Sequence, residues 1–93
     1  MSSAWEELIT VLSNVETPET LQAFLEEILT TREISVLSLR WQLLKELYAG
    51  ETQRKIAERH GISLCKITRG SKILKKKGST TRSLLEQMVP PER

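Results

Sequence analysis

The chain has 93 residues, a net charge of +2, one cysteine, one histidine and no aspartate. This length suits a single domain, and the composition excludes an intrachain disulfide, a His–Asp catalytic pair and a zinc site built from thiolates. We therefore expect a protein that is not an enzyme and that binds no metal.

Charge is distributed unevenly along the chain. Residues 1–51 hold three basic and nine acidic residues, whereas residues 52–93 hold eleven basic and three acidic residues. The second half should attract DNA and the first half should repel it. No apolar run approaches the roughly 20 residues that a membrane span needs, and the acidic N-terminus does not resemble a signal peptide, so we expect a cytoplasmic protein.

Two short amphipathic helices are predicted first. Ser2 or Ser3 can cap the first helix, and Thr17 followed by Pro18 marks the start of the second. The apolar stripe of the first helix consists of Trp5, Leu8, Ile9 and Leu12, and that of the second consists of Leu21, Phe24, Leu25 and Ile28. We interpret Trp5 as a packing residue, because an aromatic residue on such a stripe usually lies in a core.

A long third helix is capped by Thr30 or Thr31, runs to about Tyr48 and is stopped by Gly50. It carries two apolar stripes, namely Ile34, Leu37, Trp41, Leu44 and Tyr48, and Val36, Leu39, Leu43 and Leu47. Two stripes cover more of a helix than one small core needs, which favours a homodimer with interlocked or closely packed N-terminal helices. Burial within one chain is the alternative. Arg40 lies in this apolar helix, so we expect it to meet an anion or to lie at the edge of the chain.

The stretch from Thr52 to Lys76 has the spacing of two helices joined by a tight turn, which predicts a helix-turn-helix. Gly61 can adopt the positive φ that ends the first helix, and Ser63 can cap the second. Ile67 is expected to pack back onto Ile56.

The solvent side of this segment is basic and polar. It holds Gln53, Arg54, Lys55, Arg59, Lys66, Thr68, Arg69, Lys72, Lys75, Lys76 and Lys77. Such side chains suit phosphates and base edges, so duplex DNA is the expected partner. The residues expected to face DNA are Gln53, Arg54, Leu64, Cys65, Lys66, Thr68 and Lys72. The alternative is a helix pair whose lysines and arginines only keep its surface solvated.

A short last helix is predicted over residues 79–89, around Leu84, Leu85 and Met88. Pro90 and Pro91 should end it.

The segment around the predicted second helix of the motif resembles the tryptophan repressor family. The resemblance is carried by Ile67-Thr68-Arg69-Gly70-Ser71 with Leu74-Lys75, by Gly50-Glu51 and Thr52-Gln53-Arg54, and upstream by Leu29-Thr30 and Arg40. It covers roughly residues 20–76. It implies an all-α, intertwined homodimer in which L-tryptophan, as corepressor, sets the helix-turn-helix of each chain for operator DNA.

The resemblance also implies roles for individual residues. Arg69 matches the arginine that binds the ligand's carboxylate, and Arg40 matches the arginine on the other face of the indole. Thr30 matches a threonine that the partner chain contributes, and Gly70 lets the backbone approach the ring. Ile73 stands where well-known members have a serine that helps to hold the ligand's ammonium, so an indole acid without the amine is an alternative ligand.

The sequence thus predicts one Trp-repressor-like domain over residues 1–93, with dimerisation helices in 1–50, a helix-turn-helix in 52–76 and a C-terminal helix in 79–89. The predicted function is a tryptophan-activated repressor that binds palindromic operators of tryptophan biosynthesis or transport genes. Two alternatives stay open: a smaller relative that binds DNA without a ligand, and a helical dimerisation module without a nucleic-acid role.

Overall fold

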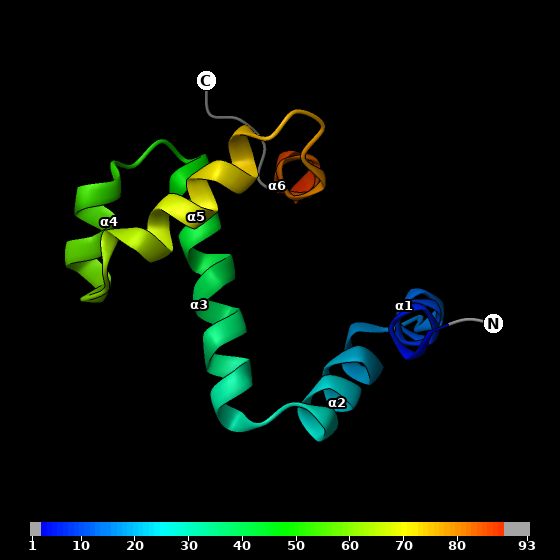
Figure 1. Cartoon of the computed structure of the whole chain (residues 1–93). Helices are drawn as coiled ribbons and strands as arrows, with labels where there is room; N and C mark the ends of the chain where they lie inside the picture. The colour runs from blue at the N-terminus through cyan, green and yellow to red at the C-terminus, as the bar shows by residue number, and fades with distance from the viewer. Residues whose placement is uncertain (1–2, 89–93) are drawn as a thin grey trace. The chain divides into compact units, whose positions relative to one another are not determined.

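The computed structural model describes residues 3–88, which form six helices (Figure 1). They are α1 (Ala4–Asn14), α2 (Pro18–Ile28), α3 (Thr31–Tyr48), α4 (Gln53–His60), α5 (Leu64–Lys75) and α6 (Thr80–Met88). No residue between 3 and 88 lies in a β-strand, and the predicted all-α class is confirmed. The chain divides into two compact units, residues 1–35 and residues 36–93. None of the helices described is long and apolar enough to cross a membrane.

The first two helices begin at the predicted caps. The Ser3 hydroxyl accepts from the Glu6 backbone N–H at 3.1 Å, and the Glu6 carboxylate accepts from the Ser3 N–H at 2.9 Å. This reciprocal capping box satisfies two N–H groups that have no partner inside the helix. The Thr17 hydroxyl accepts from the Thr20 N–H at 3.1 Å and so caps α2, with Pro18 in the first turn. Ser2, the other predicted cap of α1, lies outside the described residues.

The long helix α3 starts after Thr30, which settles the choice between the two predicted caps. The Thr30 hydroxyl accepts from the Glu33 N–H at 3.0 Å, and the Glu33 carboxylate accepts from the Thr30 N–H at 2.8 Å. At the other end Gly50 has φ 95°, a left-handed conformation that Gly adopts without strain. The predicted stop at this glycine is confirmed.

The interpretation of Trp5 as a packing residue is wrong for the single chain, because Trp5 is 69% exposed. Ile9 and Ile28 are also exposed, and within Ala4–Asn14 and Pro18–Ile28 no side chain is buried. The physical reason is size: two helices of 11 residues each cannot surround a core of their own.

The core of the second unit joins α3 to the predicted helix-turn-helix. Ile56 of α4 and Ile67 of α5 are fully buried and pack with Leu43 of α3, as predicted for the isoleucine pair. Leu39, Leu47, Ala57 and Ile62 are partly buried against this cluster. Burial of each isoleucine stabilises the fold by about 2 kcal/mol, so this cluster fixes α4 and α5 on the C-terminal half of α3.

The turn between α4 and α5 follows the prediction at Gly61 and, in position, at Ser63. Gly61 has φ 63°, and the Ile62 N–H donates to the Ala57 carbonyl at 3.2 Å, which closes α4. Ser63 occupies the N-cap of α5, but its side chain makes no capping hydrogen bond to the residues described. Ser63 is thus the N-cap residue of α5, as predicted, and has the extended backbone of a cap without the side-chain hydrogen bond.

The last helix, α6, is capped by Ser79, whose hydroxyl accepts from the Arg82 N–H at 3.1 Å. Leu85 is fully buried, whereas Leu84 and Met88 are exposed. The predicted span of 79–89 agrees with these bounds as far as Met88, and the predicted stop at Pro90 and Pro91 lies outside the described residues.

Candidate ligand cavity and nucleic-acid interface

A cavity of about 260 Å³ lies between α3 and α5. Its lining residues are Val36, Leu39, Arg40, Leu43 and Leu44 from α3 and Lys66, Arg69, Gly70 and Ile73 from α5. On each helix these positions recur every three or four residues, which places them on one face. Four of the five residues predicted for the ligand site therefore come together here: Arg40, Arg69, Gly70 and Ile73. Thr30 belongs to the other unit, and its predicted role across a dimer stays a prediction.

The lining suits a flat apolar ring that carries an anionic group. Aliphatic side chains form most of the wall, while the guanidinium groups of Arg40 and Arg69 come from opposite helices. A guanidinium can lie over an aromatic face or donate two hydrogen bonds to a carboxylate. A cavity of about 150 Å³ holds a benzene ring, so 260 Å³ leaves room for a fused ring of two cycles.

Gly70 has a structural role that the sequence interpretation did not include. A Cβ at this position would lie 3.1 Å from Leu47 Cδ1 and 3.5 Å from Leu44 Cδ2. The missing side chain thus lets α5 approach α3 closely. The predicted approach of Gly70 to a bound ring stays a prediction. Within the chain, the atoms that a Cβ at Gly70 would meet belong to Leu44 and Leu47 of α3.

The outer side of α5 carries a shallow groove of about 610 Å³. Its lining residues are Leu64, Cys65, Thr68, Arg69, Lys72, Ile73 and Lys76. Four residues predicted to face DNA, Leu64, Cys65, Thr68 and Lys72, are therefore neighbours on one surface of α5. Lys66, also predicted to face DNA, is exposed and lies at the cavity between α3 and α5, and its contact with DNA stays a prediction.

The remaining predicted DNA residues lie at the start of α4. Thr52 caps this helix, with its hydroxyl accepting from the Lys55 N–H at 3.2 Å. The Thr68 hydroxyl donates to Gln53 Oε1 at 3.2 Å, which joins the beginning of α4 to the groove side of α5. Arg54 is exposed. The hydrogen bond between Thr68 and Gln53 links the two helices on the side of the groove.

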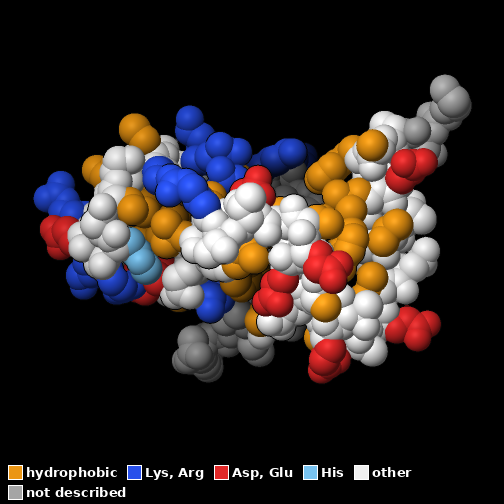
Figure 2. All heavy atoms as spheres, turned by 90° about the horizontal axis from the view of Figure 1, so that it is seen from below, with side chains coloured by type: hydrophobic (Ala, Val, Ile, Leu, Met, Phe, Trp, Pro, Cys, Tyr) orange, Lys and Arg blue, Asp and Glu red, His pale blue; other side chains and the backbone are white. Residues whose placement is uncertain are grey.

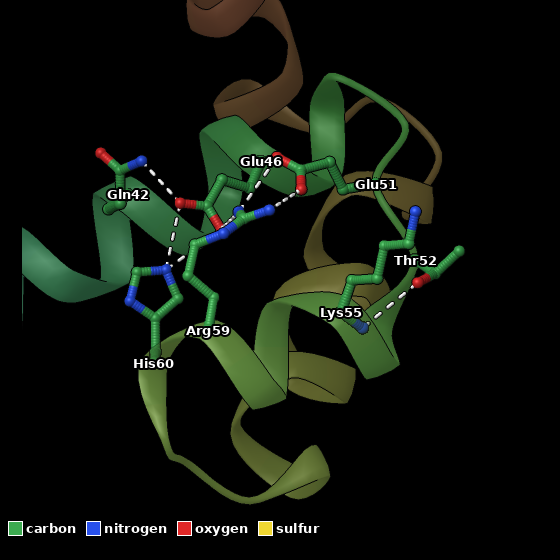
Figure 3. Close-up of polar contacts among 7 residues, drawn as sticks. All are labelled: Gln42, Glu46, Glu51, Thr52, Lys55, Arg59 and His60. Atoms are coloured by element: carbon green, nitrogen blue, oxygen red, sulfur yellow. Dashed lines mark hydrogen bonds and ion pairs between the residues drawn. The ribbon is translucent and has the colours of Figure 1, made fainter.

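A buried carboxylate, Glu46 of α3, holds α4 in place (Figure 3). Its oxygens accept from Gln42 Nε2 at 2.6 Å and from Arg59 Nη1 at 2.7 Å. His60 Nε2 lies 3.1 Å from both oxygens, and Arg59 also pairs with Glu51 in the loop before α4. Arg59 and His60 belong to the last turn of α4, so the network ties the end of that helix to α3.

The pKa values in this network follow from its geometry. Burial alone raises the pKa of Glu46, but hydrogen bonds from Gln42 and His60 and the charges of His60 and Arg59 outweigh it and hold the pKa below its ordinary value. The hydrogen bond to Glu51 raises the pKa of Arg59, which stays charged in any case. Glu46 is therefore an ionised carboxylate in the folded protein.

Arg59 lies on the solvent side, as predicted, but the network gives it two acidic partners that the sequence did not indicate. Arg59 is paired with two glutamates, and its charge is largely neutralised there. Sequence analysis missed the role of Glu46 as well. No helical spacing pairs residues 13 or 14 positions apart, so only the packing of α4 against α3 reveals the contact.

The cavity residues from α3 could have been found from the sequence. The predicted Arg40 shares a helical face with the other lining residues of α3, which are Val36, Leu39, Leu43 and Leu44. On α5, Lys66 likewise shares a face with Arg69.

In the described part of the chain, no three His, Cys, Asp or Glu side chains come together as a metal site. On the face drawn in Figure 2, the Lys and Arg side chains gather on the second unit, whereas acidic and apolar side chains gather on the first.

Comparison with known proteins assigns the chain to a family. The family model described as Trp repressor protein matches residues 3–89. The Trp operon repressor homolog of Chlamydia trachomatis serovar L2 is 32% identical over 88 residues, which is 94% of each chain. The homolog of Chlamydia caviae is 35% identical over 74 residues, covering 78% of this chain and 73% of the relative, and that of Vibrio cholerae is 29% identical over 90 residues, covering 96% and 87%. No solved structure matches the chain.

The fold and the site together define a small all-helical protein with a cationic cavity behind the second helix of a two-helix motif. The chain belongs to the Trp repressor family.

Proposed function

We propose that the protein is a DNA-binding transcriptional repressor whose corepressor is an indole-bearing acid, with L-tryptophan as the first candidate. The observation that carries the proposal is the double role of α5. One face of α5 lines the cavity with Arg69 and Ile73, and the adjacent face lines the outer groove with Thr68 and Lys72. A ligand held between Arg40 and Arg69 would therefore fix the helix that meets DNA.

Two copies of the chain are part of this proposal. Apolar side chains remain exposed on all three N-terminal helices: Trp5, Ile9, Val11, Ile28, Val36 and Leu37. A monomer rarely leaves so many large apolar residues in water, and a second copy with the same surface would cover them. Residues 1–50 would then form the dimerisation region, 52–76 the helix-turn-helix and 79–89 a C-terminal helix. The regulated genes we propose are those of tryptophan biosynthesis or transport, through palindromic operators.

Binding of ligand and DNA should be coupled. A ligand raises DNA affinity only if it binds more tightly when α5 is held in its DNA-competent position. Coupling of this kind is typically about 1 to 3 kcal/mol, or roughly 5- to 150-fold, and it is reciprocal. Operator should thus tighten tryptophan binding by the factor by which tryptophan tightens operator binding.

The test is calorimetric titration with L-tryptophan, with and without duplexes selected by the protein from a randomised pool. Arg69→Ala should abolish ligand binding and the ligand-dependent gain in DNA affinity, while sedimentation shows that the dimer is intact. Equal DNA affinity with saturating tryptophan and without it would refute tryptophan as the corepressor.

Ligand-independent DNA binding is the second candidate, and one observation favours it. The Glu46 network already holds α4 on α3 in the free chain, through Arg59 and His60. If this packing alone gives the DNA-competent arrangement, selected duplexes will bind tightly without any added acid.

A further inference from the structure

The row of side chains along the outer groove of α5 changes from apolar to cationic. Leu64, the first residue of α5, is 50% exposed and lines the groove. Thr68, Lys72 and Lys76 follow it at intervals of four residues on the same side of the helix. Among the groove residues, Leu64 is the large apolar side chain that is exposed, since Ile73 is half-buried. The row is thus aliphatic at the start of α5 and carries ammonium groups toward its end.

A protein partner and a duplex make different demands on this row. An apolar protein surface would cover Leu64 but would also remove water from Lys72 and Lys76, which costs free energy without acidic partners. A DNA duplex is anionic along its backbone, and its major groove presents an aliphatic group, the C5 methyl of thymine. The order of the side chains therefore fits a duplex whose phosphates meet the lysines and whose thymine methyl meets Leu64.

The start of α5 is also the part of the helix that should reach base edges. In helix-turn-helix proteins, Trp repressors among them, the N-terminal residues of the second helix contact bases in the major groove. The Leu64 side chain has no hydrogen-bond donor or acceptor, and the exposed thiol of Cys65 beside it is a weak donor. The Thr68 hydroxyl, one turn later, already donates to Gln53 Oε1 at 3.2 Å. Apolar contact is therefore the chemistry that the first turn of α5 offers to a base.

We infer that Leu64 is a specificity-determining residue of the DNA interface and that it selects operators with thymine at a fixed position of each half-site, through contact with the C5 methyl group. This inference rests on the proposed function in one respect, namely that α5 enters the major groove of DNA. It goes beyond that function by naming the base, and the group on that base, that the protein recognises.

The test compares thymine with deoxyuridine, which lacks only the C5 methyl and keeps every hydrogen-bonding group of the base. The full-length protein first selects duplexes from a randomised pool, once with L-tryptophan and once without it, so that the result does not depend on the corepressor. Each thymine shared by the selected duplexes is then replaced by deoxyuridine in both half-sites. Affinity is measured by fluorescence anisotropy at one fixed salt concentration. At one of these positions the affinity should fall about tenfold, which is roughly threefold for each methyl group.

Substitutions then assign the effect to Leu64. Leu64→Ala withdraws the side chain from the methyl group, so the thymine and deoxyuridine duplexes should bind this variant equally. Lys72→Met removes a charge from the same row and should weaken both duplexes alike, which leaves their affinity ratio unchanged. Leu84→Ala is the matched control and should also leave the ratio unchanged, because Leu84 is a leucine of similar exposure, 52%, that lies on α6 and does not line the groove.

The outcomes separate this inference from the proposed function. If every shared thymine can be replaced by deoxyuridine without loss of affinity, or if the selected duplexes share no thymine, the inference is overturned and the DNA-binding function stands. If the loss is as large in Leu64→Ala as in the wild type, the role of Leu64 is overturned. If no duplex is selected or bound, the proposed function itself fails, together with the inference.

Discussion

Replacement of Glu46 by glutamine should destabilise the fold, because Glu46 is the centre of the contact between α3 and α4. Its side chain is only 8% exposed and accepts hydrogen bonds from Arg59 at 2.7 Å and Gln42 at 2.6 Å. Glutamine keeps the shape but replaces one acceptor oxygen with an NH₂ group and removes the charge. Hydrogen bonds to a charged group are worth about 1.5 to 3 kcal/mol each.

The expected loss is about 2 kcal/mol, because Arg59 keeps its second partner, Glu51, and is not left uncompensated. Each kcal/mol shifts the Tm of a domain of 60 to 100 residues by about 4 to 8 °C, so the Tm should fall by about 10 °C. The assay is thermal unfolding followed by circular dichroism at one fixed protein concentration, since the stability of a dimer depends on concentration. Glu58→Gln is the matched control, because Glu58 is exposed on α4 and should change the Tm little.

The effect should also depend on pH. The pKa of Glu46 lies below its ordinary value of 4.5 in the folded protein, so its ionised form stabilises the fold. This contribution is fully present above pH 4.5 and is lost as the pH falls through the lower folded-state pKa. The difference in stability between the wild type and Glu46→Gln should therefore narrow in acid. A Tm unchanged at neutral pH, or a difference that grows in acid, would refute the assigned role of Glu46.

Three further outcomes are expected. Sedimentation at low micromolar concentration should show a homodimer, because of the exposed apolar residues of α1 to α3, and a stably folded monomer would contradict this. Arg54→Ala should weaken binding to all duplexes alike and should lower the slope of log affinity against log salt concentration by about one. The measurement is a titration at several salt concentrations. A DNA affinity that does not change with salt concentration would count against binding through phosphates. Gly70→Ala should lower the free energy of unfolding by about 1 to 3 kcal/mol, measured by chemical denaturation, because its Cβ would lie 3.1 Å from Leu47 Cδ1. Ser71→Ala is the control and should lower it less. Equal stability of Gly70→Ala and the wild type would show that α5 can move away from α3 freely.

The sequence by itself determined the local features of the fold. The predictions for Thr17 with Pro18 and for Gly61 are correct, and Thr30 is one of the two caps predicted for α3, because a cap or a left-handed turn depends on a few neighbouring residues. Helical periodicity also predicted the pairing of Ile56 with Ile67, since both lie on apolar faces that a short turn brings together. The resemblance to a family, and not the spacing, pointed to Arg40 and Arg69 as a pair.

Only the tertiary structure decided the contacts between residues far apart in sequence. Arg59 has the sequence context of a solvent-facing residue, yet it pairs with Glu46 because α4 packs across α3. Lys66 also lies at the cavity between α3 and α5, because burial of Ile67 and Gly70 fixes the rotation of α5. In both cases the direction that the side chain faces depends on which apolar face of its helix is buried. That choice is made by the packing of all the helices together and not by the residue itself.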